Sequence, residues 1–295
     1  WEMQYDFAVI GGDRRQVYLA NELKNRRYRV IVYGIREKDL DPGCRRGESL
    51  QEAVSGADSI IGPVVFSKDE KKITSDLENG GLWVKELMDE LRPGQSLFGG
   101  CISDKIRKVC REKGVEVYDF MKMDDVAIYN AIATAEGAIV KAMELKPVNL
   151  HGSRCLVLGY GRCGKVLAQK LKGMDAEVSV CARSDRARSE SEAMGFSSMD
   201  FGELSRHILR FDYIFNTVPA VVLKYPELKR LSRDACIIDI ASAPGGVDQE
   251  AAGKLQVQSY LCPSLPGIYA PKSSGIRLAE KVIKLKGKTE YEAGK

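Results

Sequence analysis

The sequence predicts an α/β protein with two Rossmann-like, doubly wound parallel-sheet domains and a cleft between them. Short apolar segments alternate with helical ones along the chain, which indicates parallel sheets covered on both faces. A glycine turn opens the second half, and 295 residues suffice for two cores. We expect an N-terminal substrate domain over 1–124, completed by a C-terminal helix over 272–295, and a dinucleotide-binding domain, with the helix that precedes it, over 125–271.

The first domain is predicted from its alternation of strands and helices. Asp13 is typical of an N-cap, and the helix that it starts should continue to Asn25. The remaining helices are expected at about 81–91 and 102–113. The strands are expected at 7–10, 29–33, 58–61, 95–98 and 115–118.

The second domain should follow a long helix from about Asp125 to Leu145, which Pro147 ends. Its predicted strands cover 155–158, 177–182, 213–216, 235–239 and 257–260. A final helix is expected from Gly275 to about Lys286, and the charged residues from Gly287 onward should fray.

The segment Arg154-Cys-Leu-Val-Leu-Gly-Tyr-Gly-Arg-Cys-Gly-Lys165 combines a buried strand, a G-x-G-x-x-G turn and the start of a helix. Such glycines permit a tight turn, close approach to a pyrophosphate and close helix–strand packing. N–H groups at the helix start then face the anion. The alternative is a purely structural glycine-rich turn. The cofactor-binding residues expected in this turn are Gly159, Tyr160, Gly161, Arg162, Cys163 and Gly164.

The end of the next strand favours NADP over NAD. An NAD site would place an acidic residue there, but the chain reads Ala182-Arg183-Ser184-Asp185-Arg186. The guanidinium and the hydroxyl both suit a 2′-phosphate. Asp185 fits the start of the following helix. The alternative is that Arg183 is a solvated loop cation.

Ligands of parallel sheets bind beyond the carboxyl ends of the strands, so residues in those segments are further candidates. Gly11, Gly12 and the helix start at Asp13 could form a carboxylate cradle. Further cofactor contacts are expected from Ala182, Arg183, Ser184, Arg186, Thr217, Val218, Pro219, Ala241 and Ser242. Further substrate contacts are expected from Arg14 or Arg15, Ser67, Ser103, Pro244, Gly245, Gly267 and Lys272.

Composition excludes several classes. The net charge of +4 comes from 45 basic and 41 acidic residues, too scattered for a nucleic-acid surface. The pairs Arg14-Arg15, Arg26-Arg27 and Arg45-Arg46 should be solvated. We expect no membrane span, no signal peptide and no metal site. Cysteines in strands, such as Cys155, should be reduced and buried, and Cys163 is a packing residue or a mildly activated thiol.

The two histidines are poorly placed for catalysis. A hydride-transfer enzyme for alcohols usually needs a histidine base. His151 precedes the first strand of the dinucleotide domain, and His207 lies in a polar helix, so neither follows a strand. Oxidation of a dihydropyridine is less dependent on such a base, because its product is aromatic.

Several of these segments together resemble the A subunit of dipicolinate synthase from spore-forming bacteria. The resemblance runs in order from Ile10-Gly-Gly-Asp-Arg-Arg-Gln16 to Ala270-Pro-Lys272 and includes Asp124-Asp-Val-Ala-Ile-Tyr-Asn130 and Leu265-Pro-Gly267. It implies oxidation of dihydrodipicolinate to pyridine-2,6-dicarboxylate during sporulation, with NADP as the hydride acceptor. It also implies a B-type flavoprotein partner and a cytoplasmic location in the mother cell. We further expect a homo-oligomer.

Within this resemblance, Asn130 and Thr134 lie four residues apart on one helix face and are expected to contact the substrate. Packing between domains is the alternative. The acidic candidates for catalysis are Asp124, Asp125 and Glu136. Two other functions stay open: an NADP-dependent reductase of another keto or imino acid, and a non-catalytic dinucleotide-binding scaffold for the flavoprotein.

Overall fold

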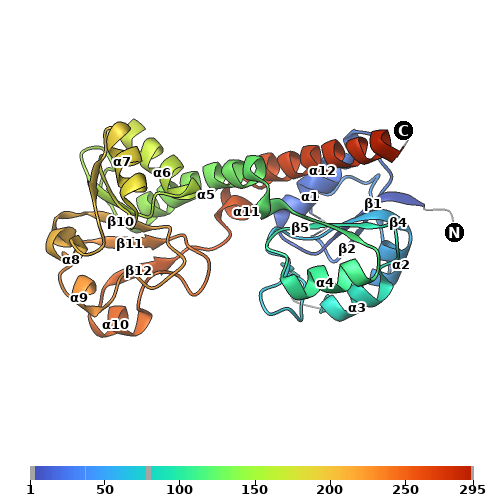
Figure 1. Cartoon of the computed structure of the whole chain (residues 1–295), viewed down its shortest axis with the longest axis horizontal. Helices are drawn as coiled ribbons and strands as arrows, with labels where there is room; N and C mark the ends of the chain where they lie inside the picture. Colours follow the sequence, from blue (N-terminus) through green and yellow to red (C-terminus); the bar gives the residue numbers. More distant parts are fainter. Residues whose placement is uncertain (1–3, 37, 78–80, 294–295) are drawn as a thin grey trace. The chain divides into compact units, whose positions relative to one another are not determined.

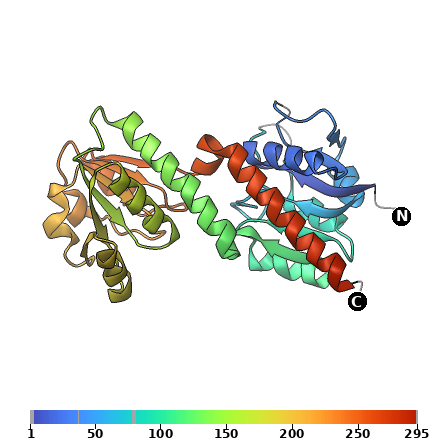
Figure 2. The same ribbon diagram turned by 90° about the horizontal axis from the view of Figure 1, so that it is seen from above.

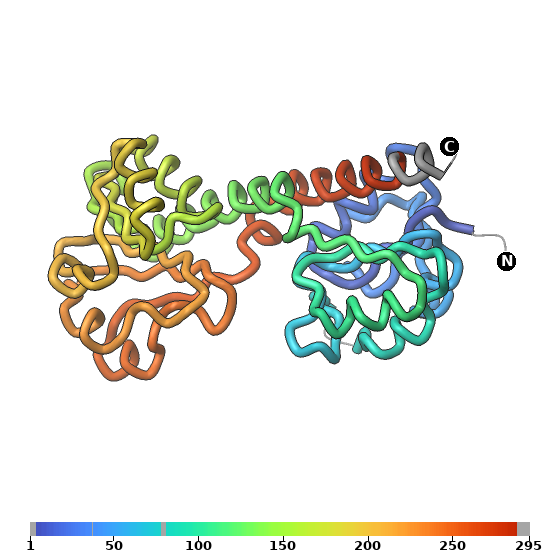
Figure 3. The backbone as a smooth tube through the Cα atoms, in the orientation of Figure 1, coloured from blue at the N-terminus to red at the C-terminus, as the bar shows by residue number. Residues whose placement is uncertain are grey.

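A computed structural model describes residues 4–36, 38–77 and 81–293, with side chains described up to residue 287. Contacts divide the chain into two compact units. The first unit contains Trp1–Ala127 and Ala270–Lys295, and the second contains Ile128–Tyr269. The chain leaves the first unit along one long helix and returns to it in the last helix (Figure 3).

The first unit is built on a six-stranded sheet with the order β3-β2-β1-β4-β5-β6, in which all neighbouring strands are parallel. Its strands are β1 (Tyr5–Ile10), β2 (Val30–Tyr33), β3 (Arg45–Arg46), β4 (Ala57–Ile61), β5 (Ser96–Gly99) and β6 (Glu116–Asp119). The alternation of side chains along β1 separates two cores, because Phe7 and Val9 pack on one face while Ala8 and Ile10 pack on the other.

Helices cover both faces of this sheet (Figure 1). They are α1 (Arg14–Asn25), α2 (Leu50–Ser55), α3 (Val84–Glu90), α4 (Asp104–Glu112) and α12 (Pro271–Ala293), with a short 3-10 helix, η1 (Phe120–Lys122). Helices α2, α3 and α4 pack on the face of Ala8 and Ile10. Helices α1 and α12 pack on the opposite face and lie side by side (Figure 2).

The second unit has a sheet of the same kind, with the order β9-β8-β7-β10-β11-β12 and parallel neighbours throughout. Its strands are β7 (Arg154–Leu158), β8 (Glu177–Cys181), β9 (Ser197–Met199), β10 (Tyr213–Asn216), β11 (Cys236–Asp239) and β12 (Gln258–Leu261). The two predicted Rossmann-like sheets are therefore confirmed. In each unit, the chain adds strands on one side of the first strand and then continues on its other side. Folds of this kind bind their ligands at this point.

The second unit is also covered on both faces. Helix α5 (Asp124–Leu145) contains the boundary between the two units. The other helices are α6 (Arg162–Gly173), α7 (Asp185–Ala193), α8 (Leu204–His207), α9 (Tyr225–Leu228), α10 (Gln249–Lys254) and α11 (Leu265–Tyr269), with the 3-10 helix η2 (Ile208–Arg210). Helices α5, α6 and α11 pack on one face of the sheet, and α8, α9 and α10 pack on the other.

Some elements differ from the sequence-based expectation. Strands β3 and β9 were not expected, because they are two and three residues long and polar. Helix α2 was not expected either, because its six residues give only one turn of apolar spacing. Arg15 does not lie on a solvated surface: only 7% of it is exposed, and it pairs with Asp13. The last helix begins earlier than expected and continues past Gly287 to Ala293 instead of fraying there.

Gly275 lies inside α12, four residues after its start at Pro271. Its backbone contacts α1, so a Cβ at this position would collide with the carbonyl oxygen of Arg15 and lie 2.9 Å from the amide nitrogen of Leu19. The glycine therefore marks a close helix crossing rather than the beginning of the helix. Residues Leu278, Ala279 and Val282 continue the contact into the core of the first unit.

Replacing Gly275 by alanine should destabilise the first unit by about 1–3 kcal/mol, because backbone atoms of α1 have to move away from the new methyl group. Urea denaturation would measure the loss, and hydrogen exchange would locate it in α1 and α12. The matched control is Gly287→Ala in the same helix. Among the described residues, no atom outside the helix backbone lies within 4 Å of the Cβ position there, so that change should leave stability equal or slightly higher. Equal stability of the two variants would contradict the crossing.

Candidate dinucleotide-binding site

The turn between β7 and α6 is shaped by two glycines. Gly159 has a φ of +90°, which side chains rarely tolerate, and its Cβ would lie 2.5 Å from the hydroxyl of Thr217. A Cβ on Gly164 would collide with the carbonyl oxygen of Gly159 and lie 2.9 Å from its carbon. These two positions therefore allow the first turn of α6 to pack directly on the end of β7.

Gly161 has a different role. It is the N-cap of α6 and offers no side chain to accept a hydrogen bond from the first turn. No heavy atom lies within 4 Å of the position that its Cβ would occupy. The start of the helix thus faces open space, and its N–H groups can approach an anion such as a pyrophosphate. We call this open start of α6 at Gly161 the open cradle, and its shape suits the pyrophosphate of a dinucleotide.

Beyond β8, the buried Ala182 leads into the exposed Arg183. The Ser184 hydroxyl caps α7 by accepting a hydrogen bond from the amide of Ala187 at 3.2 Å, and Asp185 lies in the first turn, as predicted. The Ser184 hydroxyl hydrogen remains available as a donor. In the part of the chain that the structure describes, the Arg183 guanidinium makes no ion pair.

Arg186 is in a different situation. Its Nε lies 2.9 Å from Glu190, which already neutralises much of its charge. Lys165 also binds Glu190, at 2.7 Å. The two cations together hold the pKa of the Glu190 carboxyl below its usual range. Arg183 is consequently better placed than Arg186 to bind an additional negative group.

A buried pair, Asn216 and Asp239, joins the ends of β10 and β11. Both residues are fully buried, and they stand opposite each other in the strand register. The amide of Asn216 donates to Asp239 at 2.8 Å and to the carbonyl of Val218 at 3.0 Å. The second carboxylate oxygen accepts from the amide of Gly246 at 2.7 Å.

These bonds shape the two loops at the carboxyl edge of the sheet. Asp239 also accepts from the amide of Ala241, while Gly245 has a φ of +86° and packs against the same carboxylate. Thr217 donates its hydroxyl to Leu158 and so ties its loop to the glycine turn. The loops leave three expected contact residues exposed: Pro219, Ser242 and Pro244.

The role of Asn216 and Asp239 was not predicted from the sequence. The signal that could have found them is a polar residue at the end of each of two adjacent apolar strands. Strand order decides whether two such residues meet. The sequence does not state that order, so the hydrogen bond could not be anticipated.

The acidic candidates on α5 are held by cations. Asp125 binds Lys281 at 2.7 Å, and this contact holds the pKa of Asp125 below its usual range despite some desolvation. Glu136 binds Lys170 at 2.8 Å. The lowered pKa makes Asp125 a poorer proton acceptor. Asp124 lies beside Asp125 in the first turn of the helix.

Asn130 and Thr134 lie on one face of α5, as their spacing predicts. The Thr134 hydroxyl donates to the backbone carbonyl of Asn130 at 2.8 Å, and Thr134 is 8% exposed. Its hydroxyl proton is therefore used inside the helix. The Asn130 side chain is the better donor of the two for a ligand.

The glycine turn of the first unit is filled by the protein itself. The amide of Gly11 donates to Tyr33 and that of Gly12 donates to Thr74. The Asp13 carboxylate caps α1 and binds the guanidinium of Arg15 at 2.6 Å. A free carboxylate cradle at this turn is thus not what the structure shows, because its donors already have partners.

The other expected substrate residues have varied surroundings. Ser67 donates to Asp69 at 3.3 Å, and Ser103 caps α4. Arg14 is about half exposed, and its guanidinium lies 4.0 Å from Asp39. Gly267 is buried in α11, while Lys272 is exposed in the first turn of α12. Gly11, Gly12, Asp13, Arg14, Ser67, Ser103 and Lys272 belong to the first unit, and Asn130, Thr134, Pro244, Gly245 and Gly267 to the second.

Neither the cysteines nor the histidines offer an activated group. Burial raises the pKa of Cys163, which favours packing over a reactive thiolate. Cys155, Cys181 and Cys236 are buried in strands, as predicted. His151 is exposed and lies 3.4 Å from Asp175, before β7 begins. His207 ends α8.

Neither a metal cluster nor a membrane-spanning helix is found among the described residues. No group of three or more histidine, cysteine, aspartate or glutamate side chains is arranged to hold a metal ion in residues 4–36, 38–77 and 81–287. None of the helices in the described part of the chain is both long and apolar enough to span a membrane.

Comparisons with known proteins agree with this geometry. Residues 6–121 match the family model for the N-terminal domain of the dipicolinate synthase A subunit. Residues 125–254 match the D-isomer specific 2-hydroxyacid dehydrogenase NAD binding domain. The chain is 31% identical over 290 residues to the dipicolinate synthase A subunit of Bacillus subtilis (strain 168), covering 98% of both chains.

Solved structures are similarly close. The dipicolinate synthase A subunit from Bacillus subtilis superposes with a TM-score of 0.84 at 30% identity, covering 98% of this chain and 97% of that one. The dipicolinate synthase A subunit from Bacillus halodurans gives a TM-score of 0.85 at 28% identity, covering 97% and 99%. The chain therefore belongs to the family of dipicolinate synthase A subunits, and its second unit is a dehydrogenase-type NAD-binding domain.

Proposed function

We propose that this protein oxidises dihydrodipicolinate to pyridine-2,6-dicarboxylate, with NADP as the hydride acceptor. The open cradle at Gly161 is the observation that carries this proposal, because it leaves room for a pyrophosphate at the start of α6. Membership of the dipicolinate synthase A-subunit family supplies the substrate class. The cofactor would be held by the turn at Gly159–Gly164 and by Arg183 and Ser184 after β8.

The reaction removes two hydrogens from the reduced ring. One leaves with its bonding electrons and passes to the nicotinamide, and the other leaves as a proton. Aromatisation drives the step, so a strong base matters less than it does for an alcohol. This agrees with the pairing of Asp125 with Lys281, which lowers the pKa of Asp125 and weakens it as a base.

The residues of the chain mainly bind and orient. The Asn216–Asp239 pair fixes the loops that contain Thr217–Pro219 and Ala241–Gly245, and these loops would position the nicotinamide ring. Asn130 would donate to a substrate carboxylate from α5, with Arg14 and Lys272 as further candidate cations. We assign no single catalytic base; Asp124 remains a candidate.

The biological setting follows from the family and is part of the proposal. A B-type flavoprotein subunit would be the protein partner, because the relatives are named as the A subunit of a synthase. We also propose self-association into a homo-oligomer and a cytoplasmic location in the mother cell of a sporulating bacterium.

Gly161→Val should abolish NADP binding and remove pyridine-2,6-dicarboxylate formation, because its side chain would fill the open cradle. The assay mixes purified protein, NADP and freshly generated dihydrodipicolinate, with and without the flavoprotein. Gly173→Ala, whose Cβ also meets no atom within 4 Å, is the control and should behave as the unmodified chain.

Activity that survives the loss of cofactor binding in Gly161→Val would instead indicate a non-catalytic scaffold. Failure of the unmodified chain to exceed the spontaneous rate would reject the reaction, and substrate profiling would then test a keto- or imino-acid reductase.

Arg183→Ser should weaken NADP binding by about 10- to 100-fold, since a charge-assisted hydrogen bond contributes roughly 1.5–3 kcal/mol. NAD, which lacks the 2′-phosphate, should bind almost unchanged. Fluorescence titration with both cofactors gives the two affinities. Arg186→Ser removes an equal charge that Glu190 already pairs, so it should have little effect. Equal affinity of the unmodified chain for NAD and NADP would disprove the selectivity.

Asp239→Asn should lower kcat more than it raises KM, because an amide nitrogen would then face the Gly246 N–H and loosen both loops. We expect a loss of at least about tenfold in kcat/KM, with faster hydrogen exchange in residues 217–219 and 241–246. Asp248→Asn is the control: this residue caps α10, where asparagine is an equally good cap. Equal activity of the two variants would show that the pair does not position the loops.

A further inference from the structure

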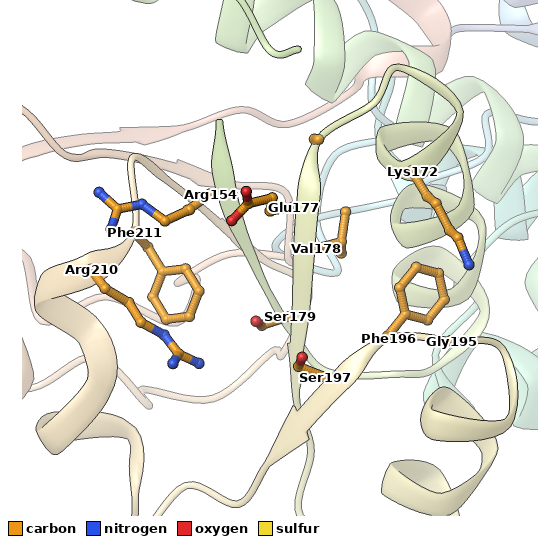
Figure 4. A pocket seen from close by; sticks show the side chains of 11 residues that line it. Arg154, Lys172, Glu177, Val178, Ser179, Gly195, Phe196, Ser197, Arg210 and Phe211 are labelled. Atoms are coloured by element: carbon orange, nitrogen blue, oxygen red, sulfur yellow. The ribbon is translucent and has the colours of Figure 1, made fainter. Parts of the chain in front are cut away.

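A second polar cavity lies in the second unit at the amino ends of its strands, away from the glycine turn. It has a volume of about 440 Å³ and lies at the starts of β7, β8 and β9 (Figure 4). Arg154 and Glu177 begin the first two of these strands, whereas Gly159 and Arg183 follow their opposite ends. The cavity is therefore separate from the proposed cofactor site.

Ser179 on β8 lines this cavity and has a hydroxyl that can hydrogen-bond a ligand. Ser179 is only 8% exposed, and within the described part of the chain its side chain makes no hydrogen bond. Figure 4 shows its oxygen directed toward the side of β8 on which Phe211 and Arg210 lie. A buried hydroxyl that points into a cavity normally binds water or a ligand.

Three cations and one acid line the cavity. The Arg210 guanidinium lies 4.9 Å from the centre of the Phe211 ring, and in the described residues it has no acidic partner. The Arg154 guanidinium lies 3.7 Å from the Asp212 carboxylate. Lys172 donates to the carbonyl of Met194 at 2.9 Å. Glu177 carries the opposing charge, so positive charge is in excess.

The size and the walls of the cavity restrict the ligand. A bare inorganic ion would fill only a small part of 440 Å³. Apolar wall comes from both sides of β8: Phe211 lies on one side with Arg210, and Val178 and Phe196 lie on the other side with Lys172 (Figure 4). Each side places a cation beside an aromatic ring, which suits a charged organic molecule. The C-terminal end of α6 lies nearby and carries a partial negative charge, which disfavours an anion. Attraction for an anion must therefore come from the cationic side chains.

We propose that this cavity binds a small organic acid that carries two or more negative groups. Arg210 and Arg154 would bind the anionic groups, Ser179 would donate a hydrogen bond, and Phe196 and Phe211 would contact the apolar body. The strands β7 and β8 are five residues long and separate this site from the cofactor edge by about 15 Å. Both ligands can therefore be bound at once.

Calorimetric titration of the full chain, with and without NADP, tests this site with citrate and isophthalate as organic probes and inorganic phosphate as the ionic one. We expect an organic probe to bind at one site per chain, with binding weakened about 10- to 100-fold by Arg210→Ser and by a smaller factor by Ser179→Ala. Arg206→Ser, which removes an exposed arginine outside the cavity, and Arg183→Ser at the cofactor edge should retain it.

Three results would overturn the proposal. The first is that neither organic probe binds. The second is that phosphate alone binds, which would indicate an ion site. The third is that Arg183→Ser abolishes binding while Arg210→Ser does not, which would place the probe at the cofactor edge. Circular dichroism and melting curves of each variant show whether a loss of binding reflects a loss of folding.

Discussion

The hydrogen bond from Asn216 to Asp239 is the constraint on which the candidate site depends. It joins the ends of the neighbouring strands β10 and β11. Asn216 also binds the backbone of the loop after β10, and Asp239 binds backbone amides of the loop after β11. A buried carboxylate is costly unless it is fully hydrogen-bonded, and this one accepts three bonds. The loop after β10 is also linked to the glycine turn, because the Thr217 hydroxyl donates to the carbonyl of Leu158 at the end of β7. The site is thus a rigid edge of the sheet.

The two units show how one strand order can serve different purposes. Both sheets reverse direction beside their first strand, and both have a glycine turn and a helix there. In the second unit the helix starts at Gly161 and faces open space. In the first unit the helix starts at Asp13, whose carboxylate takes the place of an outside anion and is neutralised by Arg15. Only the second turn is therefore suited to a phosphate.

The glycine turn and the family of the protein could be predicted from the sequence. The strand–turn–helix at Gly159–Gly164 has a local signal, since three glycines at fixed spacing follow an apolar strand within six residues. The family motifs indicated the relatives correctly. Other features need three-dimensional information: Arg15 looks like a surface cation until its pairing with Asp13 is seen, and Asn216 meets Asp239 only because β10 and β11 are neighbours. Strand β3 is two residues long and could not be distinguished from a loop.

The crossing of α12 over α1 at Gly275 affects the order in which the chain can mature. Strands β1 to β6 are synthesised before the second unit, but one face of their sheet is covered by α1 alone until α12 has been synthesised. The unit that binds the dinucleotide can close as soon as its own strands emerge, since domains fold as units during synthesis. The core of the first unit around Phe7 and Val9 is completed only after the second unit has been synthesised, because it includes Leu278, Ala279 and Val282 of α12.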